Sequence, residues 1–233
     1  MKLYNIPKSI KTIIFDIDGT LYTNSLYVFE QVDAQIRHYA HIQGITEKEA
    51  RTQINTYRKR WSAAHEGKKI SLGNTLTAFG ISIETSIQWR NELLHPEHYL
   101  KKDDRLADTL ARLAKQYRLI CVTNNPVQAA RQTLRAIGVS ELLPDIIGLD
   151  TCMKSKPARE VLDRAIERTC CTYKECVSVG DRFDIDLALP LQLGMGGILV
   201  TGVEEIYTLE ATLKKQLESS ELQEEGNHEQ NQN

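Results

Sequence analysis

Two carboxylates at the end of an apolar segment have the residue types and spacing best suited to chemistry. Residues 13–15 form a short apolar run typical of a strand buried on both faces, and Asp16 and Asp18 follow it. Residues two apart on an extended chain point to the same side, so both acids should face one small volume beyond the strand. Open α/β sheets bind their ligands at such strand ends, which favours a catalytic site here.

The same Asp-x-Asp-Gly segment is also typical of a turn, or of the start of a calcium-binding loop. An EF-hand loop requires further oxygen ligands and a glutamate at its end, with a helix on either side. Residues 20–23, with the sequence Thr-Leu-Tyr-Thr, do not fit that pattern. A plain turn therefore remains the alternative for this stretch taken alone.

Polar groups recur at the ends of later elements. Thr123 and Asn124 follow an apolar run, Lys156 stands where a helix is expected to begin, and Asp181 follows another apolar run, with Asp186 five positions later. Singly, these residues could be a helix cap, a helix start and acids at a helix amino terminus. In a parallel sheet all carboxyl ends lie along one edge, so the recurrence predicts a shared site.

The elements that would position these groups alternate between strand and helix. This order predicts an α/β fold, a Rossmann-like parallel sheet with helices on both faces. Strands are expected at residues 13–15, 119–122, 146–147, 176–179 and 198–200. Helices are expected at about 104–113, 126–137, 157–166, 182–193 and 203–216.

A helical segment interrupts this pattern. Gly44 ends a first amphipathic helix, and Thr46 with Glu49 forms a capping box that opens a second. The predicted domains are a core of residues 1–22 and 99–217, a helical cap of residues 23–98, and a disordered polar tail of residues 218–233. A lid over the strand ends is the expected role of the cap, and a purely structural bundle is the alternative.

Composition limits the classes of partner. The 233 residues contain 29 Lys and Arg against 31 Asp and Glu, a net charge of -2, which does not favour binding to a nucleic acid polymer or an anionic membrane. The sequence shows no apolar run of membrane-spanning length and no hydrophobic signal segment in residues 1–11, so cytoplasmic residence is expected. The five cysteines are expected to be free thiols, and the chain to be a monomer or homodimer.

The segment Asp16-Ile17-Asp18-Gly19-Thr20-Leu21 resembles the first signature of the haloacid dehalogenase-like hydrolases, whose members are mostly phosphatases. Val122-Thr123-Asn124 is similar to the second motif of that superfamily, and Lys156-Pro157 to the third. Gly180-Asp181 through Asp186 is similar to the fourth. The resemblance therefore covers the whole predicted α/β part.

The resemblance implies a role for each motif. Asp16 would be the nucleophile that forms an aspartyl-phosphate, and Asp18 would protonate the departing oxygen and later activate water. Thr123 and the backbone around Asn124 would donate hydrogen bonds to the phosphoryl group of the substrate. Lys156 would supply a fixed positive charge beside it.

The resemblance also implies a magnesium ion, which would relieve repulsion among the crowded acids. Its expected ligands are Asp16, the backbone carbonyl of Asp18, and Asp181. Asp186 is the expected supporting acid, because the spacing of the family motif falls on Asp186 rather than on Asp184.

These roles predict a magnesium-dependent phosphatase that acts on a small phosphorylated metabolite, with a nucleotide as first and a sugar phosphate as second expectation. A halide departs without a proton, whereas an alkoxide does not, so Asp18 favours phosphoryl transfer over dehalogenation. A phosphosugar mutase is the competing enzyme. A non-catalytic member that binds a partner is the weaker alternative, since no catalytic position is substituted.

Within the predicted cap, residues 47–94 are broadly similar to the pyrimidine 5'-nucleotidase branch. Several aromatic and cationic side chains of the predicted cap could contact a nucleotide. At helical spacing, however, such residues are commonly core or surface residues. They are Tyr27, Arg51, Tyr57, Arg58 and Trp61.

Overall fold

The computed structural model describes residues 1–67 and 69–230, with side chains described up to residue 219. The chain divides into two compact units. The first, called the core unit below, comprises Met1–Thr23 and Lys101–Asn233, and the second, the helical unit, comprises Asn24–Leu100.

The core unit contains a six-stranded sheet with the order β1-β6-β5-β2-β3-β4. Its strands are β1 (Lys2–Tyr4), β2 (Thr12–Phe15), β3 (Arg118–Val122), β4 (Ile146–Ile147), β5 (Cys176–Gly180) and β6 (Gly196–Leu199). The five predicted strands are present and parallel, but β1 was not predicted and pairs antiparallel with β6. This edge strand is three residues long and partly exposed, so it lacks the continuous apolar pattern of a buried strand.

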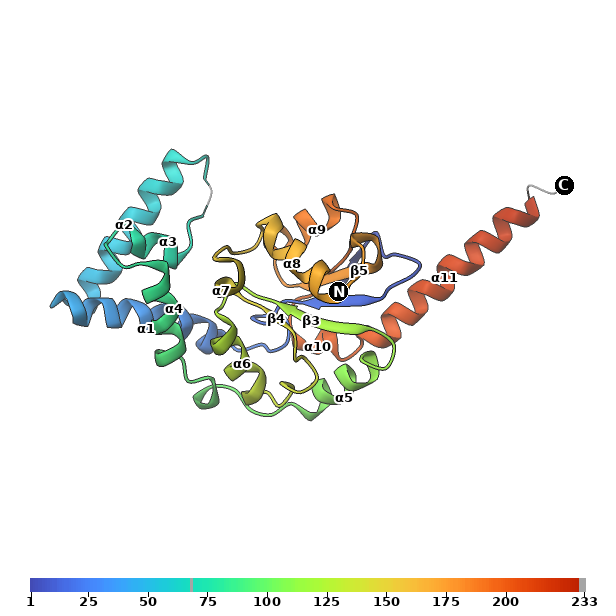
Figure 1. The fold of residues 1–233 in the computed structure, drawn as a ribbon, viewed down its shortest axis with the longest axis horizontal. Helices are drawn as coiled ribbons and strands as arrows, with labels where there is room; N and C mark the ends of the chain where they lie inside the picture. Colours follow the sequence, from blue (N-terminus) through green and yellow to red (C-terminus); the bar gives the residue numbers. More distant parts are fainter. Residues whose placement is uncertain (68, 231–233) are drawn as a thin grey trace. The chain divides into compact units, whose positions relative to one another are not determined.

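Helices cover both faces of this sheet, with α8 and α9 on one side and α5 and α6 on the other (Figure 1). The α-helices are α5 (Asp104–Leu113), α6 (Val127–Ala136), α7 (Leu149–Cys152), α8 (Arg159–Thr169), α9 (Ala188–Gln192), α10 (Val203–Ile206) and α11 (Leu209–Gln230). A 3-10 turn, η2 (Tyr173–Glu175), precedes β5, and a π-helical turn, η3 (Phe183–Leu187), leads into α9. The fold is the Rossmann-like α/β fold expected from the sequence.

Two helix boundaries differ from the predictions. Helix α8 begins at Arg159, and the Lys156–Pro157 peptide bond before it is cis, so Lys156 lies in a loop. The last predicted helix is divided into α10 and α11. The backbone of α11 continues as helix to Gln230, where a disordered tail was expected from residue 218; glutamate and glutamine are good helix formers even without an apolar face. Residues 231–233 of that predicted tail lie outside the described residues.

The central strand β2 determines where the polar groups emerge. It lies between β3 and β5, with Phe15 opposite Cys121 on one side and Val179 on the other. Ile13 and Phe15 are fully buried. Because the three strands are parallel and in this register, the residues after Phe15, Val122 and Gly180 leave the sheet at one edge.

The helical unit has its own core. It consists of α1 (Ser25–Gln43), α2 (Glu47–Ala64), α3 (Leu72–Thr77), α4 (Ile83–Leu93) and the 3-10 turn η1 (Pro96–His98). Gly44 ends α1 with a φ of 64°, and the predicted capping box of Thr46 and Glu49 opens α2. Tyr39, Ile54 and Trp89 pack in one apolar cluster, so this unit is stabilised from within.

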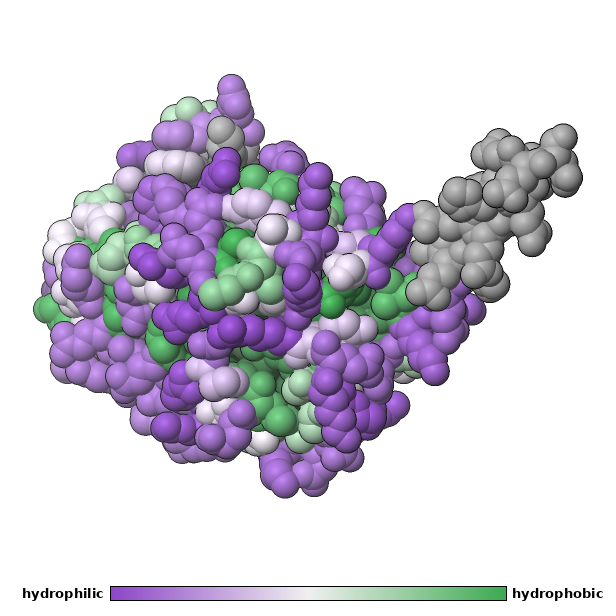
Figure 2. All heavy atoms as spheres, turned by 45° about the vertical axis from the view of Figure 1, so that its right-hand side comes forward, coloured by the Kyte–Doolittle hydropathy of each residue, from purple (hydrophilic) through white to green (hydrophobic). Residues whose placement is uncertain are grey.

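Polar residues cover most of the face drawn in Figure 2, and apolar residues appear between them. Within the described part of the chain, no helix combines the length and the apolar character needed to cross a membrane. All five cysteines are free thiols, as expected from the sequence.

Candidate active site

The carboxyl end of β2 places Asp16 in a buried position, 3% exposed, with its backbone N–H bonded to the Val179 carbonyl at 2.9 Å. The chain then turns sharply at Gly19, whose φ of 80° favours glycine. A Cβ atom on Gly19 would also lie 2.5 Å from Asp181 Oδ2. Glycine is therefore required both by the backbone conformation and by the close approach of Asp181.

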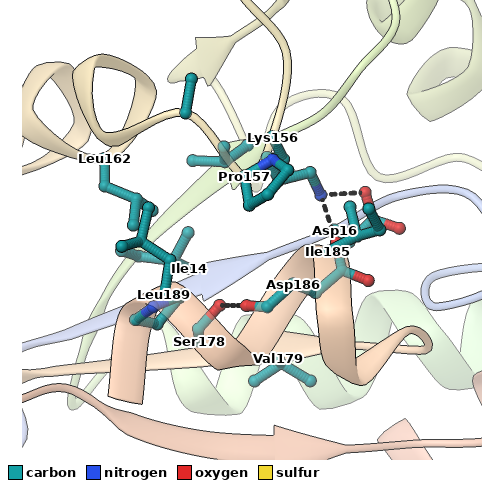
Figure 3. Close-up of a pocket in the computed structure, with 13 residues that line it drawn as sticks. Ile14, Asp16, Lys156, Pro157, Leu162, Ser178, Val179, Ile185, Asp186 and Leu189 are labelled. Carbon is teal, nitrogen blue, oxygen red and sulfur yellow. Dashed lines mark hydrogen bonds and ion pairs between the residues drawn. The ribbon is translucent and has the colours of Figure 1, made fainter. Parts of the chain in front are cut away.

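Lys156 joins two of the predicted acids. Its Nζ atom lies 2.6 Å from Asp16 Oδ1 and 2.7 Å from Asp186 Oδ1 (Figure 3). Burial by itself would lower the pKa of Lys156, but the two carboxylates outweigh burial and raise it. The buried site thus contains a protonated amine shared between two carboxylates, which could also face the oxygens of an anionic substrate.

Asn124 fixes the backbone that carries this lysine. Its Oδ1 accepts a hydrogen bond from the Lys156 N–H at 2.6 Å, and its Nδ2 donates to the Lys156 carbonyl at 3.4 Å. Lys156 lines a pocket whose apolar wall includes Ile14, Leu162 and Leu189 (Figure 3). The amide of Asn124 therefore links the end of β3 to the lysine loop.

Asp186 is bonded through both carboxylate oxygens. Beyond its contact with Lys156, its Oδ2 accepts a hydrogen bond from the Arg182 N–H at 3.0 Å. Ser178 Oγ donates to the Asp186 carbonyl at 2.8 Å, which anchors the turn η3 to β5. Asp184, the other acid of this segment, is exposed and lies outside the buried acidic cluster.

Two other carboxylate oxygens in the cluster accept no hydrogen bond from the described residues. Asp16 Oδ2 and Asp181 Oδ1 are buried and have no hydrogen-bond partner among the described residues. Oxygens of Asp16, Asp181 and Asp186 all lie within 4.8 Å of one another. Burial raises the pKa of Asp16 to about 7 and also raises the pKa of Asp181. Buried carboxylate oxygens without donors are the ligands that a hard divalent cation prefers, so these residues fit magnesium.

Thr123 lies at the same edge of the sheet and is 1% exposed. Its N–H donates to the Ile147 carbonyl at 3.0 Å, and its Oγ1 accepts from the Asn125 N–H at 3.2 Å. The structure therefore brings Asp16, Lys156, Asp181 and Asp186 into one cluster, with Thr123 at the end of the strand next to β2.

Asp18 lies beside this cluster and contacts two residues that had no predicted role. Tyr22 Oη donates to Asp18 Oδ1 at 2.6 Å, and Asn125 Nδ2 donates to Asp18 Oδ2 at 2.8 Å. Asn125 could have been found from its position beside Asn124 at a strand end. Tyr22 carries no such signal, because its contact depends on the turn at Gly19.

Arg182 is a further cation without a predicted role. Its Nε lies 3.6 Å from Asp181 Oδ1 and 4.0 Å from Asp186 Oδ2. The pKa of Arg182 is raised, because nearby acids, Asp186 foremost, outweigh the opposing effect of burial. Because Arg182 directly follows Asp181 in the sequence, its place near the site could have been predicted.

The cap residues considered for nucleotide binding make contacts inside the helical unit. Arg51 forms ion pairs with Asp33 and Glu47, and Arg58 donates to the Ile70 carbonyl at 2.9 Å. Aromatic rings pair in the same unit: Tyr27 with Tyr99, Tyr57 with Phe79, and Trp61 with His65. These contacts explain the residue types without a ligand.

An α/β sheet with a buried cluster of acids and a lysine at its carboxyl edge is an arrangement suited to hydrolytic chemistry on an anionic substrate. Residues 10–194 match the family model described as haloacid dehalogenase-like hydrolase. The chain therefore belongs to the haloacid dehalogenase-like hydrolase family.

Solved structures of several members share this fold. The magnesium-bound HAD-hydrolase YfnB from Bacillus subtilis aligns with a TM-score of 0.56 and 20% identity, over 86% of this chain and 98% of that one. A HAD phosphatase from Thermococcus onnurineus aligns with a TM-score of 0.56 and 21% identity, over 82% and 86%. A 2-haloacid dehalogenase from Pseudomonas syringae pv. tomato aligns with a TM-score of 0.56 and 16% identity, over 88% and 99%. At these identities the similarity shows the fold alone.

Proposed function

We propose that the protein is a magnesium-dependent phosphatase that hydrolyses a small phosphate monoester through an aspartyl-phosphate on Asp16. The observation that carries this proposal is a pair of buried carboxylate oxygens, one of Asp16 and one of Asp181, that accept no hydrogen bond from the described residues and lie in one cluster with the buried amine of Lys156. Asp16, Asp181 and the backbone carbonyl of Asp18 would hold the ion. When bound, magnesium neutralises charge on the carboxylates and on the phosphoryl oxygens.

The residues of the chain would act in two steps. In the first step a carboxylate oxygen of Asp16 attacks phosphorus, the bond from phosphorus to the ester oxygen breaks, and protonated Asp18 gives its proton to that oxygen. In the second step Asp18 takes a proton from water, whose oxygen attacks the phosphorus of the aspartyl-phosphate. Phosphate then leaves and Asp16 is regenerated.

The cationic groups would make this attack by one anion on another feasible. Lys156 is held between Asp16 and Asp186, so its ammonium group can neutralise phosphoryl oxygens without moving. Thr123 and the backbone around Asn124 would donate hydrogen bonds to the same oxygens. The position of Asp18 two residues beyond Asp16 supports phosphoryl transfer over dehalogenation, because an alkoxide leaving group needs a proton and a halide does not.

The substrate is proposed only by its chemical class. A nucleoside monophosphate is the first expectation and a sugar phosphate the second. Cytoplasmic residence and a monomeric or homodimeric state stay predictions from the sequence.

The test measures phosphate release from p-nitrophenyl phosphate with magnesium. The wild-type protein should turn over, whereas EDTA or Asp16→Asn should lower kcat by roughly 1,000-fold or more, with the fold intact by circular dichroism. Asp184→Asn is the matched control, because Asp184 lies in the same motif but is exposed, and it should retain activity. Undiminished turnover by Asp16→Asn would overturn the proposal, and isomerisation of a sugar phosphate without free phosphate would instead support a mutase.

A further inference from the structure

Both carboxylate oxygens of Asp18 accept hydrogen bonds from side chains. Tyr22 Oη lies 2.6 Å from Oδ1, and Asn125 Nδ2 lies 2.8 Å from Oδ2. Asp16 and Asp181 differ in this respect, since each keeps one buried oxygen that accepts no hydrogen bond from the described residues. Asp18 therefore differs from Asp16 and Asp181 in that side-chain donors occupy both of its carboxylate oxygens.

The turn after β2 fixes the first donor. The N–H groups of Thr20 and Leu21 both donate to the Ile17 carbonyl, at 3.2 and 2.9 Å, and Tyr22 forms an isolated bridge with Asp18. The tyrosine is 4% exposed, so its ring has little freedom to move. This turn therefore brings the phenol back to the carboxylate four residues before it.

The end of β3 fixes the second donor from the other side. The Asn125 N–H donates to Thr123 Oγ1 at 3.2 Å, and the Asn125 carbonyl accepts from the Leu149 N–H at 3.0 Å. A Cβ atom on Gly148 would lie 2.7 Å from that carbonyl oxygen, so the two segments are closely packed. Hydrogen bonds at both its N–H and its carbonyl therefore hold the backbone of Asn125 in place.

We infer that Tyr22 and Asn125 are positioning residues that hold the Asp18 carboxyl in the orientation needed to protonate the leaving group. This inference rests on the proposed phosphatase function. Two hydrogen bonds to the two oxygens of one carboxyl group fix the rotation of that group, and proton transfer requires such alignment. A carboxyl group keeps acceptor capacity when it is protonated, so Tyr22 Oη can donate to Asp18 before and after the proton is transferred.

A positioning role and a merely structural role differ in their dependence on the leaving group. p-Nitrophenolate is a weak base that departs with little need of a proton, whereas the alkoxide of glycerol 2-phosphate departs only when protonated. Misorienting Asp18 should therefore slow the alkyl ester far more than the aryl ester. Loss of stability alone would lower both by the same factor.

The experiment compares kcat/KM, which reports the step that expels the leaving group, for these two esters with magnesium. Tyr22→Phe and Asn125→Ala should each lower kcat/KM for glycerol 2-phosphate by roughly 10- to 100-fold and for p-nitrophenyl phosphate by less than about 3-fold. Inhibition by inorganic phosphate should stay within about twofold of wild type, because the phosphoryl site is unchanged. Tyr22→Phe keeps the buried ring, so it decides the test even where Asn125→Ala is unstable.

Tyr207→Phe is the matched control. Tyr207 Oη donates to Asp103 Oδ2 at 2.6 Å, the same type of bond at the start of α5 and outside the site. This variant should leave the ratio of the two kcat/KM values unchanged. Equal losses on both esters, or no loss, in Tyr22→Phe would overturn the inference and leave the phosphatase function standing. A wild-type protein that hydrolyses neither ester would overturn the proposed function and this inference with it.

Discussion

Two buried aspartates, one in each unit of the chain, differ in how their charge is compensated. Asp33 in the helical unit is 5% exposed and Asp16 in the core unit is 3% exposed. Arg51 donates to both oxygens of Asp33 at 2.9 Å and Arg37 donates to one of them, and the hydrogen bonds from Arg51 contribute most to lowering the pKa of that carboxyl. Asp16 has one lysine contact, one unpartnered oxygen and a raised pKa.

The difference separates a structural carboxylate from one prepared for chemistry. Asp33 ties α1 to α2 through Arg51, and its charge is matched within the protein. Asp16 and Asp181 each keep a buried oxygen that accepts no hydrogen bond from the described residues, so a bound cation would supply the positive charge that the proposed function requires. Buried acids whose compensation is incomplete therefore indicate the functional site more sharply than acids that are merely buried.

Removing Lys156, the cation that contacts Asp16, should have the largest effect on stability and activity. Lys156→Met leaves Asp16 and Asp186 buried without their shared cation, so we expect a loss of about 3–5 kcal/mol in the free energy of unfolding and roughly 1,000-fold or more in kcat. Denaturant unfolding and phosphate release measure the two effects. Lys154→Met is the control, because Lys154 is half exposed and pairs with Glu160 at the surface. If Lys156→Met were as stable and active as Lys154→Met, the lysine would have no role in the cluster.

The pH dependence of stability should have opposite signs for the two aspartates. In the protein without metal the pKa of Asp16 is about 7, above the ordinary value of 3.8, so between these values the folded state retains a proton that the unfolded state releases. Its contribution to stability therefore falls as pH rises from about 4 to about 7. The pKa of Asp33 is lowered, so its contribution is present above about pH 4 and is lost as pH falls through its folded value.

Denaturant unfolding in EDTA at about pH 5 and about pH 7.5 separates these signs. The wild-type protein should lose more stability between the two values than Asp16→Asn, and added magnesium should reduce the loss. Identical pH dependences for wild type and Asp16→Asn would show that the carboxyl of Asp16 does not titrate in this window.

Neutralising Asp33 should have the smallest effect. Asp33→Asn keeps the shape of the side chain but removes the charge paired with Arg37 and Arg51, which are both partly exposed, so we expect about 1–2 kcal/mol of destabilisation. Turnover of p-nitrophenyl phosphate should be retained. Glu47 is an exposed ion-pair partner of Arg51, so Glu47→Gln should change the free energy of unfolding by less than about 0.5 kcal/mol. If Asp33→Asn were as stable as the wild-type protein, this carboxylate would have no structural role.

The sequence predicted the five parallel strands and the polar residues that follow them because both depend on simple rules. A buried parallel strand is an apolar run, and the polar residues directly after it lie at the sheet edge, as with Asp16 after Phe15 and Thr123 after Val122. The types of these polar residues also follow from the proposed chemistry, because few other side chains could replace an acid or a lysine at the sheet edge.

What the sequence did not reveal depends on contacts between distant segments or on details of turns. Asn125 lies 107 positions from Asp18, and Tyr22 reaches it only through the turn at Gly19. The short strand β1 and the delayed start of α8 likewise depend on neighbours in space. The aromatic and cationic residues of the helical unit follow an ordinary helical pattern, so the sequence alone could not show which residues of the same unit they contact.

Magnesium binding tests the central claim most directly, because it probes the carboxylate oxygens of Asp16 and Asp181 that accept no hydrogen bond, and it does not require turnover. By isothermal titration calorimetry, wild-type protein should bind about one magnesium ion, and Asp181→Asn should weaken binding at least about tenfold, whereas Asp33→Asn should bind like wild type. Equal magnesium affinity in wild type and Asp181→Asn would contradict the account, since the ion would then be held somewhere other than between Asp16 and Asp181.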